Sequence, residues 1–309
     1  MQARSGASGT QRRSPGGRAA RREREQAAAR QRRIVLLAGA AIVVLLVGLV
    51  VVRSIAGRGA SAPAENTPAP PELVAQVANV DPALYEQIGR GTLTQLPTPV
   101  RAQVETGPSG LPKVSYIGAE YCPFCAAERW ALVAALGRFG TFSNLQLTHS
   151  ASDDVYPNTP TFSFVGSSYT SPYVEFSPVE LQGNVRSGNT YQALQTPTPD
   201  QSHVLQTYDA PPYVPAQSAG AIPFIDFGGQ YVAAGASYDA GVLRGMSADQ
   251  IAASLADPTT PQAKGILGQA NAMTAAICTA TGNTPAEVCS QPSVTALQSA
   301  LAATPVPSR

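Results

Sequence analysis

The residues best suited to chemistry in this sequence are Cys122 and Cys125, which enclose Pro123 and Phe124. A short apolar run at 114–117 precedes them, and apolar residues at helical spacing follow as far as Phe139. The pair therefore lies where a strand passes into a helix. Unpaired N–H groups at a helix N-terminus favour an anion, so we expect a low pKa for Cys122 and attack by its thiolate on disulfides. Cys125, one turn along, would resolve the mixed disulfide, and Pro123 suits an early helical position.

Two other interpretations of this pair stay open. A zinc site would need a second CxxC or a pair of histidines at suitable spacing, whereas the two histidines, His149 and His203, are isolated. A purely structural disulfide is the other alternative. The strand-to-helix setting favours redox chemistry over both, and we expect neither a bound metal nor a cofactor.

Cys278 and Cys289 form a second pair, separated by ten residues that include a turn at 281–283. No strand-to-helix junction precedes Cys278. We therefore predict a structural disulfide, which the chain-entropy model values at about 3 kcal/mol for so short a loop. Such a bond persists in an oxidising compartment.

The rest of the pattern predicts an α/β fold. We expect a second strand at 145–148, then a long polar region at 151–221 with strands at 161–165 and 173–176 and a helix at 199–208. Strands at 223–227 and 230–234, joined by Gly228-Gly229, indicate an antiparallel hairpin. Beyond Ser247 the pattern is helical.

The N-terminal part predicts a membrane anchor. Residues 1–33 contain ten arginines and two glutamates, and residues 34–52 are uncharged and apolar over roughly the thickness of a bilayer core. A cleaved signal peptide and a basic nucleic-acid-binding tail are the alternatives. The apolar run is longer than a signal-peptide core, and the tail has no aromatic residue to stack on bases, so we expect no nucleic-acid partner.

The predicted organisation has five parts. Residues 1–33 form a basic cytoplasmic tail, 34–52 a transmembrane helix in contact with the lipid bilayer, and 53–80 a Pro/Ala-rich linker. Residues 81–290 form the folded domain, and 291–309 a C-terminal tail. Because arginines precede the apolar run, we expect a single-pass protein of the cell membrane with its C-terminal domain outside the cytoplasm.

Two segments resemble thioredoxins. The run VSYIGAEYCPFC at 114–125 is similar to their first strand and active site, and IPFIDFGG at 222–229 to the segment with the cis-proline and the following hairpin. Longer runs, among them GAEYCPFCAAERWALVAALGRFGTFSNL, resemble an uncharacterised bacterial and archaeal thioredoxin-like family known only as a domain of unknown function, over about 81–290.

The resemblance implies a thioredoxin-like fold with a long insertion, 151–221, before the cis-proline hairpin, and a helical C-terminal extension. It implies that Pro223 follows a cis bond and faces the CxxC motif, with Ile222 presenting its backbone to a substrate and Pro123 and Phe124 also in contact with it. An ordinary trans proline at an edge strand is the alternative. The insertion would be a client-binding surface or a structural cover over the sheet.

One position departs from the thioredoxin pattern. Thioredoxins carry a buried acidic residue six positions before the first active-site cysteine, and here that position is Tyr116. Glu128 is a candidate proton relay in its place, with a solvated surface carboxylate as the alternative. We expect Arg129 and Trp130 to contribute to packing and solvation rather than to catalysis.

These features together predict a thiol-disulfide oxidoreductase that exchanges disulfides with cysteine-containing client proteins, with a membrane or soluble redox partner. Oxidation of clients is favoured slightly over reduction or isomerisation. The alternative from another class is a non-enzymatic binding module or a copper chaperone, because two thiolates suit Cu(I).

Overall fold

The computed structural model describes residues 66–308. The predicted basic tail at 1–33 and transmembrane helix at 34–52 lie outside this range. Within it, no helix combines the length and the apolar character needed to cross a membrane.

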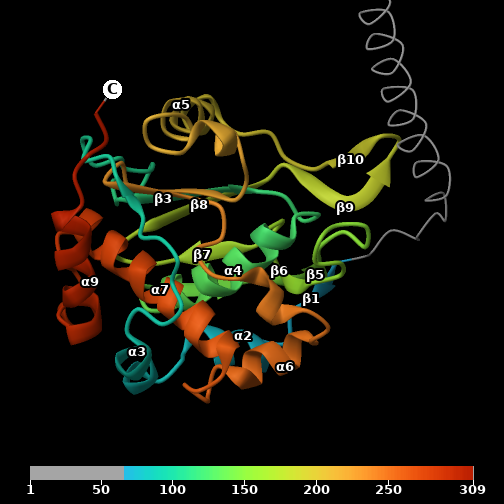
Figure 1. Cartoon of the computed structure of the whole chain (residues 1–309), viewed down its shortest axis with the longest axis horizontal. Coiled ribbons are helices and arrows are strands. Elements are labelled where there is room, and N and C mark those ends of the chain that lie inside the picture. The colour runs from blue at the N-terminus through green and yellow to red at the C-terminus, as the bar shows by residue number, and fades with distance from the viewer. Residues whose placement is uncertain (1–65, 309) are drawn as a thin grey trace, which may run out of the picture. The chain divides into compact units, whose positions relative to one another are not determined.

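The centre of the described part is a mixed five-stranded sheet in the order β2-β12-β11-β3-β8 (Figure 1). β3 runs parallel to β8 on one side and antiparallel to β11 on the other. β11 in turn forms a hairpin with β12. The strands are β2 (Thr98–Pro99), β3 (Lys113–Gly118), β8 (Glu175–Glu180), β11 (Phe224–Phe227) and β12 (Tyr231–Ala234).

Both faces of this sheet are covered, and successive side chains of each strand point to opposite faces. Val114 and Tyr116 of β3 and Ile225 of β11 belong to the large core on one face, while Phe224 and Val232 form a smaller cluster that includes Val204 of α5. Helices α4 and α7 pack on the first face, and α5 lies on the other (Figure 1). The sheet is thus the middle layer of three.

Eight α-helices occur in the described residues, and most begin at a proline. A proline in the first turn loses no hydrogen bond, because its missing N–H would be unpaired there. Their bounds are α2 (Pro71–Ala78), α3 (Pro82–Ile88), α4 (Pro123–Leu136), α5 (Pro199–Tyr208), α6 (Ala248–Ser254), α7 (Pro261–Ala280), α8 (Ala286–Cys289) and α9 (Pro292–Ala303). The predicted helix at 199–208 and the helical character beyond Ser247 are therefore confirmed.

The hairpin predicted around two glycines is also present. Gly228 and Gly229 both have positive φ, 61° and 69°, and the N–H of Gln230 donates to the carbonyl of Phe227 at 3.1 Å. Glycine adopts this conformation without a steric cost. The turn sets β11 and β12 in register beside β3.

Three small sheets surround the central one. They pair β1 (Thr67–Pro68) with β5 (Gln146–His149) and β6 (Pro160–Ser163), β4 (Thr141–Ser143) with β7 (Ser168–Thr170), and β9 (Gln182–Ser187) with β10 (Thr190–Ala193). The β9–β10 hairpin projects from the body of the fold (Figure 1).

The structure corrects the predicted order of strands. The strand expected at 145–148 exists as β5 but belongs to a peripheral sheet, and the parallel neighbour of β3 is β8. The region 151–221 is therefore not simply an insertion, because it supplies one strand of the central sheet. Pairing between distant strands is decided by packing, which local patterns do not report.

Two predicted boundaries are also wrong. Residues 66–80 are not part of a linker, because β1 pairs with β5 and α2 packs against α4 with Leu73 and Val77 buried. Residues 292–303 are not a tail, because α9 packs on α7 through Val294 and Leu301. Proline and alanine gave residues 66–80 the composition of a linker, while buried side chains at helical spacing fix both segments to the fold.

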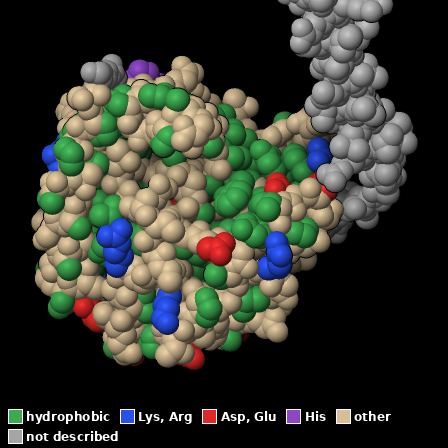
Figure 2. Space-filling model, in the orientation of Figure 1, with side chains coloured by type: hydrophobic (Ala, Val, Ile, Leu, Met, Phe, Trp, Pro, Cys, Tyr) green, Lys and Arg blue, Asp and Glu red, His purple; other side chains and the backbone are tan. Residues whose placement is uncertain are grey.

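Charges are sparse on the surface of the described part. On the face drawn in Figure 2, basic and acidic side chains lie singly or in small groups among hydrophobic and neutral polar ones. Only 13% of the whole chain is charged. Charged side chains that are nevertheless buried therefore call for a specific explanation, and several lie close to the two free cysteines.

Candidate active site around Cys122 and Cys125

Cys122 is the N-cap residue of α4, immediately after the loop that leaves β3. Its Sγ accepts a hydrogen bond from the backbone N–H of Cys125 at 3.4 Å, as a cap side chain does. Cys122 and Cys125 are free thiols. Cys122 keeps 6% of its surface exposed and Cys125 none, so only Cys122 offers its sulfur to a partner.

The two thiols differ in acidity as well as in access. Hydrogen bonding with Cys125 lowers the pKa of Cys122 and outweighs its burial, with further help from the N–H groups of Phe124 and Cys125 and from the charge of Arg129. Burial raises the pKa of Cys125 well above its usual value, and the neighbouring Cys122 adds to this effect. Cys122, the more accessible of the two thiols, is therefore also the more acidic one.

The segment before β11 faces this pair. The bond between Ile222 and Pro223 is cis, as predicted, and the Sγ of Cys122 lies 3.8 Å from the carbonyl oxygen of Ile222. The structure thus brings together Cys122, Cys125, Ile222 and Pro223 from two distant parts of the chain.

Aromatic side chains border the motif on two sides. Tyr121 stacks on Tyr191 of the β9–β10 hairpin, with ring centroids 4.3 Å apart. Phe124 makes an edge contact with Tyr156 at 6.0 Å and remains 39% exposed. Residues of the region 151–221 therefore form part of the rim. The sequence placed Phe124 at the site but gave no sign of Tyr156 or Tyr191.

A buried ion pair lies beneath the motif. Arg129 of α4 donates from Nε and Nη2 to the two carboxylate oxygens of Glu180 in β8, at 2.8 and 2.7 Å. Both side chains are fully buried. The expectation that Arg129 serves surface solvation is wrong. Its spacing of four residues from Cys125 was a signal that the two share a helix face, whereas Glu180 could not be found without the strand order.

Tyr116 occupies the position where thioredoxins have an acid, and it too is buried. Its hydroxyl has no hydrogen-bond partner among the described residues, and the Arg129 guanidinium lies 5.9 Å from its ring centroid. Burial raises its pKa well above the usual value, so this phenol does not act as a base near neutral pH.

Glu128 points away from this arrangement. It is fully buried against α7, where its Oε2 accepts a hydrogen bond from the amide of Gln269, so the surface carboxylate considered from sequence is wrong. Burial raises its pKa to about 8. Its role as a proton relay stays a prediction. Trp130 packs against Phe162 with centroids 4.7 Å apart, as expected for a packing residue.

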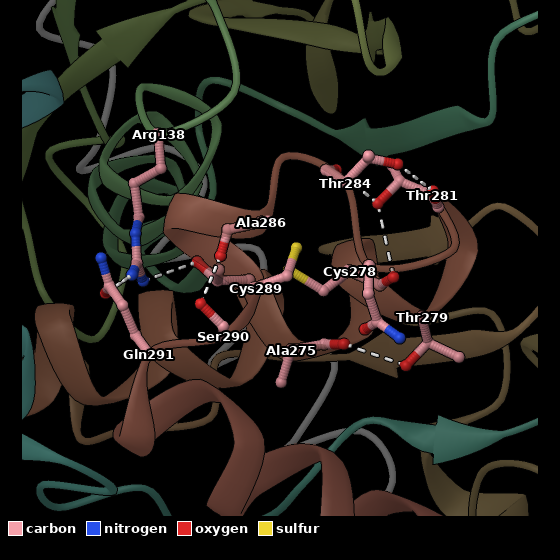
Figure 3. Close-up of a disulfide and its surroundings, with 12 residues drawn as sticks. Arg138, Ala275, Cys278, Thr279, Thr281, Thr284, Ala286, Cys289, Ser290 and Gln291 are labelled. Atoms are coloured by element: carbon pink, nitrogen blue, oxygen red, sulfur yellow. Dashed lines mark hydrogen bonds between the residues drawn. A yellow bond between two sulfur atoms is a disulfide. The ribbon is translucent and has the colours of Figure 1, made fainter.

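The predicted disulfide between Cys278 and Cys289 is present and joins the end of α7 to α8 (Figure 3). Its Cα atoms are 5.6 Å apart. Around it, the hydroxyls of Thr281 and Thr284 bond reciprocally to each other's carbonyls at 2.7 and 2.6 Å. The bond closes a short loop and so has a structural setting, distinct from that of the free pair.

Among residues 66–308, no group of three or more His, Cys, Asp or Glu side chains is arranged to hold a metal ion. The sulfur atoms of Cys122 and Cys125 are the two soft donors that the site itself offers.

A comparison with protein families matches residues 102–279 to a domain of unknown function, DUF929. The match covers more than half of the 309 residues, so the chain belongs to this family. The predicted resemblance to a family known only as a domain of unknown function is confirmed, over a narrower range than 81–290. No curated protein and no solved structure matches the chain.

Proposed function

We propose that this member of the DUF929 family is a membrane-anchored thiol-disulfide oxidoreductase with a thioredoxin-like fold, acting outside the cytoplasm. The observation that carries the proposal is the asymmetry of the free pair. Cys122, at a helix N-terminus with a lowered pKa, stands over the buried Cys125 and beside the cis bond of Pro223.

The topology supports the thioredoxin-like assignment. β3, α4 and β8 form a β-α-β unit with parallel strands, and the β11–β12 hairpin followed by α7 completes a sheet in which β3 lies between β8 and β11. In thioredoxins the CxxC motif follows the equivalent of β3 and faces a cis-proline before the equivalent of β11. The segments that resemble thioredoxins in sequence occupy these positions.

The chemistry would be exchange through a mixed disulfide. In the oxidising direction, a client thiolate attacks Sγ of Cys122 in the Cys122–Cys125 disulfide, and Cys125 leaves as the thiolate and takes up a proton. A second client thiolate then attacks the client sulfur and releases Cys122 as the thiolate. The client loses two electrons and two thiol protons, and the Cys122–Cys125 pair gains the two electrons. A partner disulfide must then reoxidise the pair by the same exchange.

The lowered pKa of Cys122 favours this direction, because stabilising the leaving thiolate stabilises the reduced site relative to the disulfide. The carbonyl of Ile222 would bind a client strand by its backbone, with Phe124 beside it. The arginine-rich segment before residue 34 supports an anchor at 34–52 with the described domain outside the cytoplasm.

Trapping of clients tests the proposal. With Cys125→Ser, the Cys122 thiolate can still attack a client disulfide, but no second thiol of the pair is left to resolve the product, so mixed disulfides with cysteine-containing clients should accumulate as reducible high-mass species in the native membrane. Cys122→Ser is the matched control and should trap almost nothing. Accumulation on Cys122→Ser alone would reverse the roles of the two cysteines. If neither variant trapped clients while the wild type retained Cu(I) tightly, the copper-chaperone alternative would replace this one.

A further inference from the structure

The Arg129–Glu180 pair occupies a position that structural stability alone does not explain. Removing a charge from water is costly, and a buried ion pair is often no more stabilising than an apolar pair of the same volume. Here both side chains are fully buried, and Nη1 of Arg129 has no hydrogen-bond partner among the described residues. The guanidinium therefore keeps an unpaired donor in the interior of the domain.

The helix geometry places this charge under the cysteines. Arg129 follows Cys125 by four residues and the N-cap Cys122 by seven, so all three lie on one face of α4. Glu180 approaches from β8, where it lies opposite Gly118 at the end of β3, next to the loop that leads to the motif. The guanidinium thus lies on the helix face that carries the cysteines and is bonded to the carboxylate.

We propose that Arg129 is a positioning residue for the redox pair, whose buried positive charge stabilises the thiolate of the reduced site and makes the site oxidising, and that Glu180 limits this effect. The inference rests on the proposed oxidoreductase function and gives it a direction. In the oxidised site neither sulfur carries a charge, so the attraction to Arg129 acts on the reduced form alone.

The charged groups around Cys122 and Cys125 agree with this role. The positive charge of Arg129 acts to lower the pKa of both thiols, although burial still keeps the pKa of Cys125 well above its usual value. Glu180 counteracts burial and holds the guanidinium protonated, so that the pKa of Arg129 lies well above its usual value. Other titratable groups surround these charges. The phenols of Tyr116 and Tyr121 lie near both cysteines, and the carboxylate of Glu120 helps to raise the pKa of Glu180.

Opposite substitutions separate this electrostatic role from a structural one. Arg129→Met removes the positive charge and leaves Glu180 to become protonated, so the thiolate of Cys122 should lose stability. Glu180→Gln keeps an amide oxygen for Arg129 but removes the negative charge, so the thiolate should gain stability. A role in folding alone would give both variants the same kind of defect.

The measurement is the pH dependence of Cys122 alkylation by iodoacetamide in the reduced full-length protein. We expect the midpoint to rise by on the order of one pH unit in Arg129→Met and to fall in Glu180→Gln, the size typical of removing one neighbouring charge. In glutathione buffers, Arg129→Met should shift the equilibrium about tenfold towards the disulfide, which is about 30 mV in reduction potential.

Arg138→Met is the matched control. Arg138 is also largely enclosed, but it lies beyond the far end of α4, over the ring of Tyr85 and bonded to Asn271 and Thr274. Its loss should lower stability and leave the Cys122 midpoint in place. If Arg129→Met does not fold, the direction in which Glu180→Gln shifts the Cys122 midpoint decides whether Arg129 has the proposed role.

An unchanged midpoint in either folded variant, or shifts of the same sign in both, would overturn the role of Arg129. A shift of the same size in Arg138→Met would do so too, because it would show that any lost cation has this effect. If instead the wild-type cysteines form no disulfide in glutathione buffers, the proposed oxidoreductase function fails, whereas the alkylation profiles still decide how Arg129 acts on Cys122.

Discussion

Replacing Glu128 by glutamine tests whether this buried carboxyl is neutral in the folded protein. The amide of Gln269 donates to Oε2 of Glu128, while Oε1 of Glu128 and Oε1 of Gln269 have no hydrogen-bond partner within residues 66–308. Two buried acceptors cannot pair with each other. If Oε1 of Glu128 carries a proton, it can donate to the amide oxygen of Gln269, and both unpaired atoms are satisfied. The pKa of about 8, raised by burial, agrees with this arrangement.

The consequence is a loss of stability as the pH rises. Below about pH 4.5 the carboxyl is protonated in both the folded and the unfolded chain and makes no contribution to the pH dependence. Between that value and about 8, the unfolded chain releases the proton while the folded protein retains it. The free energy of unfolding then falls by about 1.4 kcal/mol per pH unit, on the order of 4 to 5 kcal/mol in all. Glutamine has the shape and the donor of the neutral acid, so Glu128→Gln should abolish this slope.

Urea unfolding followed by circular dichroism at several pH values between about 5 and 8 measures the effect. The difference in free energy of unfolding between Glu128→Gln and the wild type should grow in favour of the variant by about 1.4 kcal/mol for each pH unit. Asp226 and Asp209, whose pKa values burial also raises, to about 8 and about 7, are present in both proteins and cancel in the difference. Parallel pH profiles of the two proteins would refute the assignment of a neutral Glu128.

Three further predictions concern stability and topology. Replacing Cys278 and Cys289 together by alanine should lower the free energy of unfolding by about 3 kcal/mol, since the bond spans 11 positions; an unchanged urea midpoint would contradict this. Trp130→Ala should cost about 3 to 5 kcal/mol by the same measurement, because the ring is fully buried and its Nε1 donates to the carbonyl of Pro160 at 2.9 Å; Trp130→Phe should cost less. Protease added outside intact cells should remove the described domain and leave the N-terminus protected, and the reverse pattern would exclude the proposed topology.

The sequence by itself determined the features that depend on a few neighbouring residues. The cap position of Cys122 follows from a strand, a proline and a helical stripe within about 25 residues, and the turn at Gly228-Gly229 follows from the freedom of glycine at positive φ. The disulfide between Cys278 and Cys289 closes so short a loop that its partners were evident from spacing. In each case the interacting groups are close along the chain, where local conformation fixes their geometry.

Only the tertiary structure decided which distant groups meet at the site. β8 is the parallel neighbour of β3 although about 60 residues intervene, and this pairing alone brings Glu180 to Arg129. Glu128 and Arg129 are adjacent in sequence, yet one faces α7 and the other faces β8. Whether a charged side chain is solvated or buried depends on what covers its side of the helix. That is decided by the packing of elements far apart in the chain, and the charge environment of the cysteines is decided with it.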